Sequence, residues 1–159
     1  MNISKDLKAI LVLTLSTLLL FCFIIIKREP QNYEYPPISS EVYFDIMLPS
    51  YVPDDYTVNY ISTSPAVVVV EYTSERGLVY FSQLNAVTFS LSLDNENHTI
   101  TEYHSDRFDG YLLIDTENKN SRLISVWDEH NSFEITGNLE EYEIYKMIES
   151  IEVYATPSE

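Results

Sequence analysis

The sequence predicts an α+β fold: mainly an antiparallel β-sheet meander with a C-terminal helix packed on it, preceded by one transmembrane helix. Three observations support this prediction. Residues 9–26 form an uninterrupted apolar run, β-branched and aromatic residues alternate with polar ones through most of residues 41–154, and an apolar stripe recurs at helical spacing near the C-terminus. The chain has 159 residues, enough for one packed domain in addition to the anchor.

The predicted anchor runs from Ala9 through Leu13 and Leu20 to Ile26 without a charged residue, Gly or Pro. A helix of this length spans roughly 27 Å, about the thickness of the hydrocarbon core of a bilayer. No small-residue cleavage site follows Ile26, which argues against a removed signal peptide. We therefore expect residues 1–8 to be a short cytoplasmic tail and residues 9–26 to be a transmembrane signal anchor in the lipid bilayer.

The charges beside the anchor favour neither orientation, because Lys5 and Lys8 balance Lys27 and Arg28. The amine of the initiator residue favours an N-terminus inside the cell. From Glu29 onward, 24 acidic residues face 5 basic ones, a net charge of −19, and large domains translocate largely regardless of charge. We expect a single-pass protein of the cell membrane with an extracytoplasmic C-terminal domain.

The region after the anchor begins with residues 29–40, whose Pro30, Pro36 and Pro37 predict a stiff, extended spacer. The domain follows at residues 41–154, and residues 155–159 form a short tail. Alternating residue patterns predict eight strands, at 57–62, 66–73, 78–84, 88–93, 99–104, 111–115, 122–127 and 133–136. Short clusters of Asn, Asp, Ser and Gly between them predict tight turns, as in a meander.

The strand at 66–73 begins with five successive apolar residues, Ala66 to Val70. Such a run predicts a central strand covered on both faces. The helix is predicted to begin at Asn138, because Asn at the N-cap and Glu141 three residues later match a capping box. It extends to about Ser150. Its predicted sheet-facing stripe contains Ile144, Met147, Ile148 and Ile151.

The composition excludes several classes of function. Nine basic residues against 25 acidic ones give a net charge of −16, which leaves no basic surface for nucleic acid. Three glycines do not supply a glycine-rich phosphate loop, and a single cysteine, Cys22, makes neither an intrachain disulfide nor a zinc cage. No local pattern pairs a nucleophile with a base. We expect a protein without cofactor or catalytic activity.

The best candidates for metal ligands are Glu102 and His104, which share one face of the strand predicted at 99–104. His98 has the same parity, but about 13 Å of strand separates it from Glu102. Only Glu102 and His104 are thus close enough to share an ion. The competing interpretation is a solvated sheet face. These residues carry one alternative function, a metal-dependent or acid-pair hydrolase.

Aromatic residues are the second group of candidates. Trp127 ends the strand predicted at 122–127, where it is either a core anchor or an aromatic residue of a binding face. The 13 tyrosines have two interpretations as well. They form cross-strand pairs on a half-exposed sheet, or they make a surface that stacks on sugars, peptides or a partner protein.

The order of several segments resembles a bacterial family known as the domain of unknown function number four-three-six-seven. The resemblance covers roughly residues 44–151 and is carried by residues 48–49, residues 52–56, Tyr72, the segment GLVYFSQ at 77–83, residues 125–127, residues 133–138 and the segment KMIESI at 146–151. Members of the family usually have Gly where Asp55 stands. Because Asp tolerates a left-handed turn better than most residues, we expect the turn to be retained.

The resemblance implies an extracytoplasmic domain behind one membrane helix in Gram-positive bacteria, in some cases in proteins similar to anti-sigma factors. The eight residues before the anchor are too few for a sigma-binding domain, so we expect a partner to carry any signal. The predicted function is therefore a non-catalytic binding or sensing module of the cell envelope. Its partner would be an envelope protein or a cell-wall ligand. A further alternative is a lipid or hydrophobic-ligand binding domain, with a cavity between sheet and helix.

Overall fold

The computed structural model describes residues 33–38, 42–87, 97–119 and 121–157. They belong to one compact unit of the chain, Tyr33–Glu159. The predicted anchor lies outside the described residues, as do Cys22 and the strand predicted at 88–93. The anchor residues concerned are Ala9, Leu13, Leu20 and Ile26. Among the described residues, no helix combines the length and the apolar character needed to cross a membrane.

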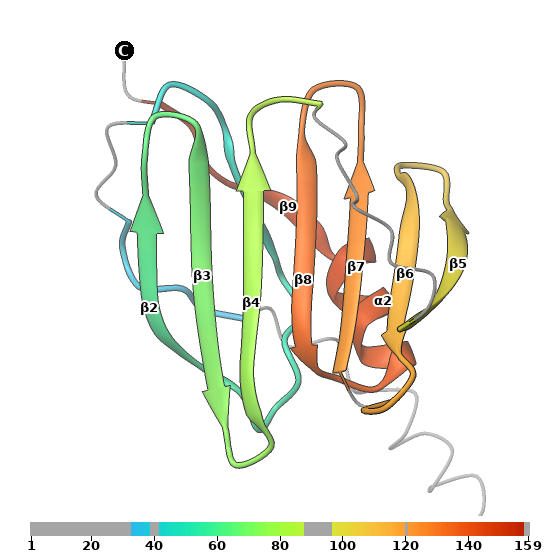
Figure 1. The fold of residues 1–159 in the computed structure, drawn as a ribbon. Helices are drawn as coiled ribbons and strands as arrows, with labels where there is room; N and C mark the ends of the chain where they lie inside the picture. Colours follow the sequence, from blue (N-terminus) through green and yellow to red (C-terminus); the bar gives the residue numbers. More distant parts are fainter. Residues whose placement is uncertain (1–32, 39–41, 88–96, 120, 158–159) are drawn as a thin grey trace, which may run out of the picture. The chain divides into compact units, whose positions relative to one another are not determined.

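The main layer of the domain is a seven-stranded antiparallel sheet with the strand order β2-β3-β4-β8-β7-β6-β5 (Figure 1). The strands are β2 Thr57–Thr63, β3 Val67–Ser74, β4 Gly77–Leu84, β5 His98–His104, β6 Asp109–Asp115, β7 Ser121–Trp127 and β8 Ser132–Asn138. Two further strands, β1 (Ile46–Pro49) and β9 (Ile151–Ala155), form a two-stranded antiparallel sheet. The helix α2 (Glu141–Glu149) and β9 lie behind the large sheet in Figure 1.

This architecture confirms the α+β class, with a mainly antiparallel sheet and a C-terminal helix. The continuous meander is wrong in one respect, because β4 pairs with β8 and not with β5. Strands β2 to β4 form one series of hairpins, and β5 to β8 form a second series that returns toward β4. The residues of a turn predict the hairpin on either side of it, because they are local in the sequence. The pairing of β4 with β8 is a long-range contact, so the turn residues do not predict it.

The valine-rich strand is not the central one. β3 is second from the β2 edge, and β8 occupies the middle of the sheet. Val68 and Val70 are fully buried, whereas Val67 and Val69 are half-buried on the face turned away from α2. Valine also suits a half-exposed sheet face, because its branched side chain packs well on a pleated surface. A run of valines is therefore compatible with a strand that is fully buried on one side only.

The N-cap of the helix lies two residues later than predicted. Glu140 is the N-cap, and its capping box pairs it with Glu143 instead of pairing Asn138 with Glu141. The backbone N–H of Glu140 donates to Glu143 Oε2 at 2.8 Å. Asn138 remains in β8, where its side chain donates to the carbonyl of Arg76 at 2.9 Å. The Asn138 side chain, which the local pattern predicted to cap the helix, thus makes a long-range hydrogen bond to Arg76 instead.

The hydrophobic core lies between the large sheet and the layer of α2, β1 and β9. The predicted stripe of α2 is confirmed as part of it, because Ile144, Met147 and Ile148 are fully buried. They belong to one core cluster with sheet residues such as Phe81 and Phe133, whose ring centroids lie 6.3 Å apart.

Candidate binding site at the β2 edge

Residues 33–38 pack against the domain, although they lie in the predicted extended spacer. Tyr33, Tyr35 and Ile38 contact the hydrophobic core. The backbone N–H of Tyr33 donates to the carbonyl of Ser50 at 2.7 Å, just after β1. Residues 33–38, which follow the predicted anchor in the sequence, are therefore part of the folded domain. We call residues 33–38 the docked segment.

Four tyrosines hold the docked segment in place, and we call them the tyrosine cluster: Tyr33, Tyr35, Tyr72 and Tyr154. The ring of Tyr35 lies 4.9 Å from that of Tyr33, 6.4 Å from that of Tyr72 and 5.5 Å from that of Tyr154, measured between centroids. The last two pairs are edge-to-face, a favourable arrangement for aromatic rings. Residues from three distant parts of the sequence therefore meet around Tyr35.

Hydrogen bonds fix the orientation of these rings. The Tyr35 hydroxyl donates to the carbonyl of Pro49 at 2.7 Å. It also lies 2.7 Å from the Tyr72 hydroxyl, which must be the donor in this pair because a phenol has only one proton. Burial raises the pKa of both hydroxyls, and the effect is large for Tyr72. Both groups therefore stay neutral and keep their hydrogen bonds over the physiological pH range.

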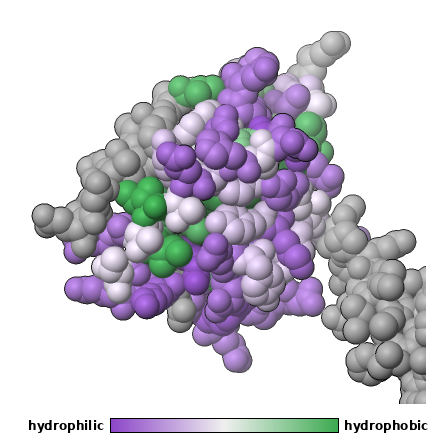
Figure 2. Space-filling model, turned by 90° about the vertical axis from the view of Figure 1, so that its right-hand side faces the viewer, coloured by the Kyte–Doolittle hydropathy of each residue, from purple (hydrophilic) through white to green (hydrophobic). Residues whose placement is uncertain are grey.

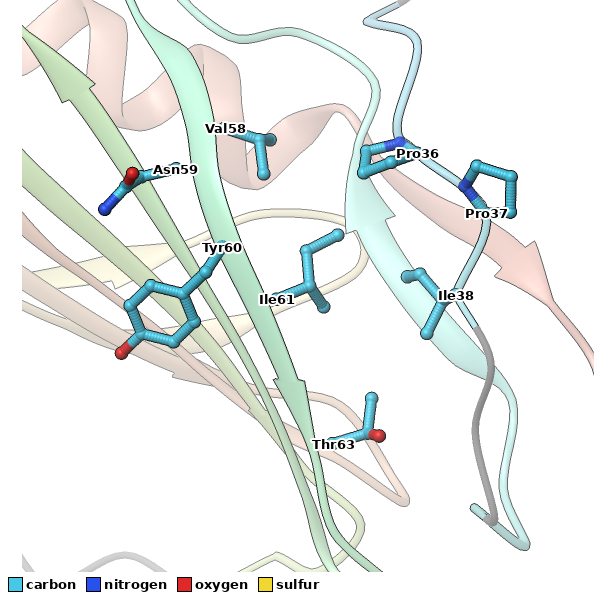
Figure 3. A pocket seen from close by; sticks show the side chains of 8 residues that line it. All are labelled: Pro36, Pro37, Ile38, Val58, Asn59, Tyr60, Ile61 and Thr63. Atoms are coloured by element: carbon cyan, nitrogen blue, oxygen red, sulfur yellow. The ribbon is translucent and has the colours of Figure 1, made fainter.

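A surface pocket of about 290 Å³ separates the docked segment from strand β2. It is lined by Pro36, Pro37, Ile38, Val58, Asn59, Tyr60, Ile61 and Thr63. Figure 3 shows Val58, Ile61 and Thr63 pointing toward the docked segment, whereas Asn59 and Tyr60 project from the other side of β2. The pocket therefore follows the edge of the strand. Its accessible lining is more polar than apolar, although side chains such as Ile38 and Ile61 contribute to it.

The β2 edge also presents backbone hydrogen-bonding groups. Ser64 and Val67 exchange both backbone hydrogen bonds at the β2–β3 turn, so they form a hydrogen-bonded pair. Such pairs alternate with non-hydrogen-bonded ones along an antiparallel ladder. Ile61 and Thr63 occupy the non-hydrogen-bonded positions, opposite Val70 and Val68. Their N–H and C=O groups hence point away from β3, toward the pocket.

Part of this edge is already occupied. The backbone N–H of Val58 donates to the Tyr33 hydroxyl at 2.8 Å. The ladder is irregular between Val58 and Tyr60, so Asn59 has no partner residue of its own in β3. Beyond this bulge, and within the part of the chain that the structure describes, the outward backbone groups of Ile61 and Thr63 have no hydrogen-bond partner. The open stretch of the edge is therefore short.

The electrostatic surroundings of the pocket are acidic. Glu34 is exposed within the docked segment. Glu71 in β3 has only 8% of its surface exposed, and it accepts a hydrogen bond from Asn59 Nδ2. A hydrogen bond to Glu71 raises the pKa of Tyr80. No Lys, Arg or His among the described residues forms an ion pair with Glu71, so its charge has no cationic partner there.

The predicted metal candidates lie at the other end of the sheet. Glu102 and His104 share one face of β5, and His104 Nε2 lies 3.6 Å from Glu102 Oε2. Asp109 is closer, at 2.8 Å from His104 Nδ1. In the described ranges, no group of three or more His, Cys, Asp or Glu side chains has a geometry that could hold a metal ion. Figure 2 shows this mostly hydrophilic side of the domain.

Trp127 is half-buried at the end of β7 and is not part of the core cluster. Its neighbour Val126 is fully buried, and side chains alternate along a strand, so Trp127 points to the face away from α2. The centroid of its ring lies 6.0 Å from that of Tyr111. The core-anchor interpretation of Trp127 is therefore wrong.

The residues of the β2 edge were not singled out by the sequence. A usable signal was present, because Tyr33 and Tyr35 immediately precede the pair Pro36-Pro37. Aromatic residues beside prolines indicate a segment that can dock as well as extend. Their partner Tyr72 lies 37 positions further along the chain, and no local pattern connects it to Tyr35.

The fold and the pocket define a small, mainly antiparallel α+β domain with an accessible sheet edge. Comparison with protein families matches residues 46–151 to the family described as Domain of unknown function (DUF4367). The chain belongs to this family, as its sequence resemblance suggested. Among curated proteins, no sequence matches the chain.

Proposed function

We propose that the chain is a single-pass protein of the bacterial cell envelope whose extracytoplasmic domain acts by binding a partner at the β2 edge. The observation that carries this proposal is the pocket of about 290 Å³ between β2 and the docked segment. One wall of the pocket is the docked segment, which begins seven residues after the end of the predicted anchor at Ile26. Binding at this position is therefore coupled to the part of the chain that connects the domain with the membrane.

Two further observations support the proposal. The apolar run at 9–26 has the composition of a membrane anchor, and the family resemblance implies an extracytoplasmic domain. The pocket places some apolar side chains beside the outward backbone groups of Ile61 and Thr63, a combination typical of sites that recognise an extended chain. The alternative hydrolase residues Glu102 and His104 are exposed on β5, at the opposite edge of the sheet from this pocket.

The location of the domain is tested by labelling with a membrane-impermeant maleimide. The chain is prepared with Cys22→Ser and Thr156→Cys, so that the only thiol lies just after β9. We expect labelling in intact cells at the level reached after lysis. Labelling that requires lysis would place the domain in the cytoplasm and contradict the envelope function.

The binding role is tested by photocrosslinking in intact cells. A photoreactive amino acid replaces Thr63 at the pocket, and the control replaces Glu117, an exposed residue in the turn after β6. We expect a discrete crosslinked product from position 63 and none from position 117. Identical results at the two positions would remove the β2 edge as the binding site.

A further inference from the structure

We infer that the occupant of the β2 edge is a basic, extended peptide segment that adds to the sheet as a short strand beside Ile61 and Thr63. This inference rests on the proposed binding function and names the chemistry of the partner. It follows from three properties of the site: the direction of its backbone groups, the pocket beside them and the acidic charge of Glu71, which has no cationic partner among the described residues.

The outward backbone groups of β2 favour a partner in extended, strand-like conformation. The outward N–H and C=O groups of Ile61 and Thr63 are two residues apart, so they match the hydrogen-bonding period of an added strand. The Tyr33 hydroxyl already accepts the N–H of Val58, which limits the addition to the stretch beyond the bulge. A peptide of about five residues covers this stretch, at roughly 3.3 Å per residue.

The two faces of β2 indicate which kinds of side chain the bound peptide carries at alternate positions. Ile61 and Thr63 point into the pocket, where Ile38 and Pro36 form the opposite wall. Side chains of a strand alternate between faces, so every second residue of the peptide enters this pocket, where it can contact these apolar side chains. The residues between them lie on the other face, beside Tyr60, which has 45% of its surface exposed.

Charge complementarity selects a basic peptide over a second copy of this chain. Glu71 is buried beside the Tyr60 position of the ladder without a cationic partner among the described residues, and Glu34 is exposed in the docked segment. A Lys or Arg side chain on the outer face contacts the Tyr60 ring and approaches the Glu71 carboxylate. Two copies, each with a net charge of −16, would instead repel one another.

The test uses the full chain in phosphatidylcholine nanodiscs and two synthetic probes. The basic probe is acetyl-Lys-Val-Lys-Val-Lys-amide, and the matched control is acetyl-Glu-Val-Glu-Val-Glu-amide. Amide hydrogen exchange is measured by NMR, with empty nanodiscs as a control for adsorption of the peptide to lipid. We expect saturating basic peptide to slow exchange at Ile61 and Thr63 by about fivefold or more, and the acidic peptide to have no effect.

Two proline variants separate strand addition from general attraction. Ile61→Pro removes an outward N–H without removing a ladder bond, and prolines are tolerated on edge strands. Ile100→Pro is the matched control on the opposite edge strand β5, where bonds at Asn97 and Ser105 place Ile100 at an outward position. We expect Ile61→Pro to abolish binding and Ile100→Pro to retain it. Circular dichroism verifies that each variant is folded.

Glu71→Gln tests the charge without altering the backbone. We expect weaker binding of the basic peptide, with the remaining complex still protecting Ile61 and Thr63. Failure of the basic peptide to protect these amides overturns the inference, as does unchanged binding to Ile61→Pro. Protection that rises with protein concentration in the absence of peptide also overturns it, in favour of a second copy. If the peptide fails while crosslinking from position 63 succeeds, only the inference falls and the proposed function stands.

Discussion

Arg76 and Glu143 form a two-bond ion pair that joins the β3–β4 turn to the first turn of α2. Arg76 Nη1 lies 2.9 Å from Glu143 Oε2, and Nη2 lies 3.0 Å from Oε1. Glu143 is buried, and its Oε2 also accepts the N–H of Glu140. The same guanidinium binds Asp55 and lies 4.9 Å from the centre of the Tyr56 ring. One side chain thus connects three separate segments.

Replacing Arg76 therefore tests the energetic value of this connection. We expect Arg76→Ala to lower the free energy of unfolding by about 3 kcal/mol, because it leaves the buried Glu143 carboxylate without its cation. Asp55→Asn is the matched comparison. About half of the Asp55 side chain is exposed, so its loss should cost less than about 1 kcal/mol. Urea unfolding followed by circular dichroism measures both, and equal losses would contradict the assignment.

The tyrosine cluster supplies the second prediction. Tyr35→Phe removes the donor to the Pro49 carbonyl and the acceptor of the Tyr72 hydroxyl, whose residue is fully buried. We expect a loss of about 2 kcal/mol in the free energy of unfolding, because a buried polar group remains unpaired. Amide exchange in the docked segment should become faster. Tyr43→Phe is the control, since Tyr43 is 81% exposed. Unchanged exchange in Tyr35→Phe would show that the cluster does not hold the segment.

His104 supplies a prediction on pH. The hydrogen bond to Asp109 raises its pKa above the ordinary value of 6.5, and Glu102 adds a smaller effect in the same direction. The pKa is raised in the folded state, so the pair stabilises the domain fully below the unfolded value. This stabilisation is lost as the pH rises through the folded pKa. An NMR titration should show Asp109→Asn lowering the pKa of His104 more than Glu102→Gln does. The opposite order would show that Glu102 is the main partner.

The helix stripe supplies the fourth prediction. Ile148 is fully buried in the core cluster, and Tyr142 on the same helix is 59% exposed. We expect Ile148→Asp to lower the free energy of unfolding by about 3 kcal/mol or more, because it buries an unpaired charge. Tyr142→Asp should cost far less. Thermal unfolding measures both variants, and similar melting temperatures would mean that the stripe does not face the sheet.

Local patterns were sufficient for the hairpins and for the apolar face of the helix. Gly77 has a positive φ of 126° in the turn predicted between the strands at 66–73 and 78–84, and glycine adopts this conformation without steric strain because it has no Cβ. The same reasoning does not hold for Asp55, because no described residue other than Gly has a positive φ. Asp55 instead binds Arg76, which comes 21 positions later. The departure from the family pattern thus has a tertiary explanation.

Strands β1 and β9 show where local patterns fail. β1 has only four residues, too few for alternation to be recognised, and β9 follows the helix directly with Ile151 buried. Ile151 was predicted as the last residue of the helical stripe. It is indeed buried, but as the first residue of a strand paired with Pro49. The sequence pattern thus predicted correctly that Ile151 is buried. Its strand conformation depends on pairing with a residue about a hundred positions away, which the local pattern does not contain.

The amino-acid sequence alone determined the α+β class, the hairpin turns, the apolar stripe of the helix and the family, because each depends on neighbouring residues or on their order. Tertiary structure decided the pairing of β4 with β8, the docking of residues 33–38, the isolation of the Glu71 charge and the open β2 edge. These features arise where segments distant in the sequence come into contact. The free energy of such a contact depends on both segments, so the sequence of one segment alone does not predict it. The candidate binding site is therefore a property of the fold, since Tyr35, Tyr72 and Ile61 acquire their roles only when the chain brings them together.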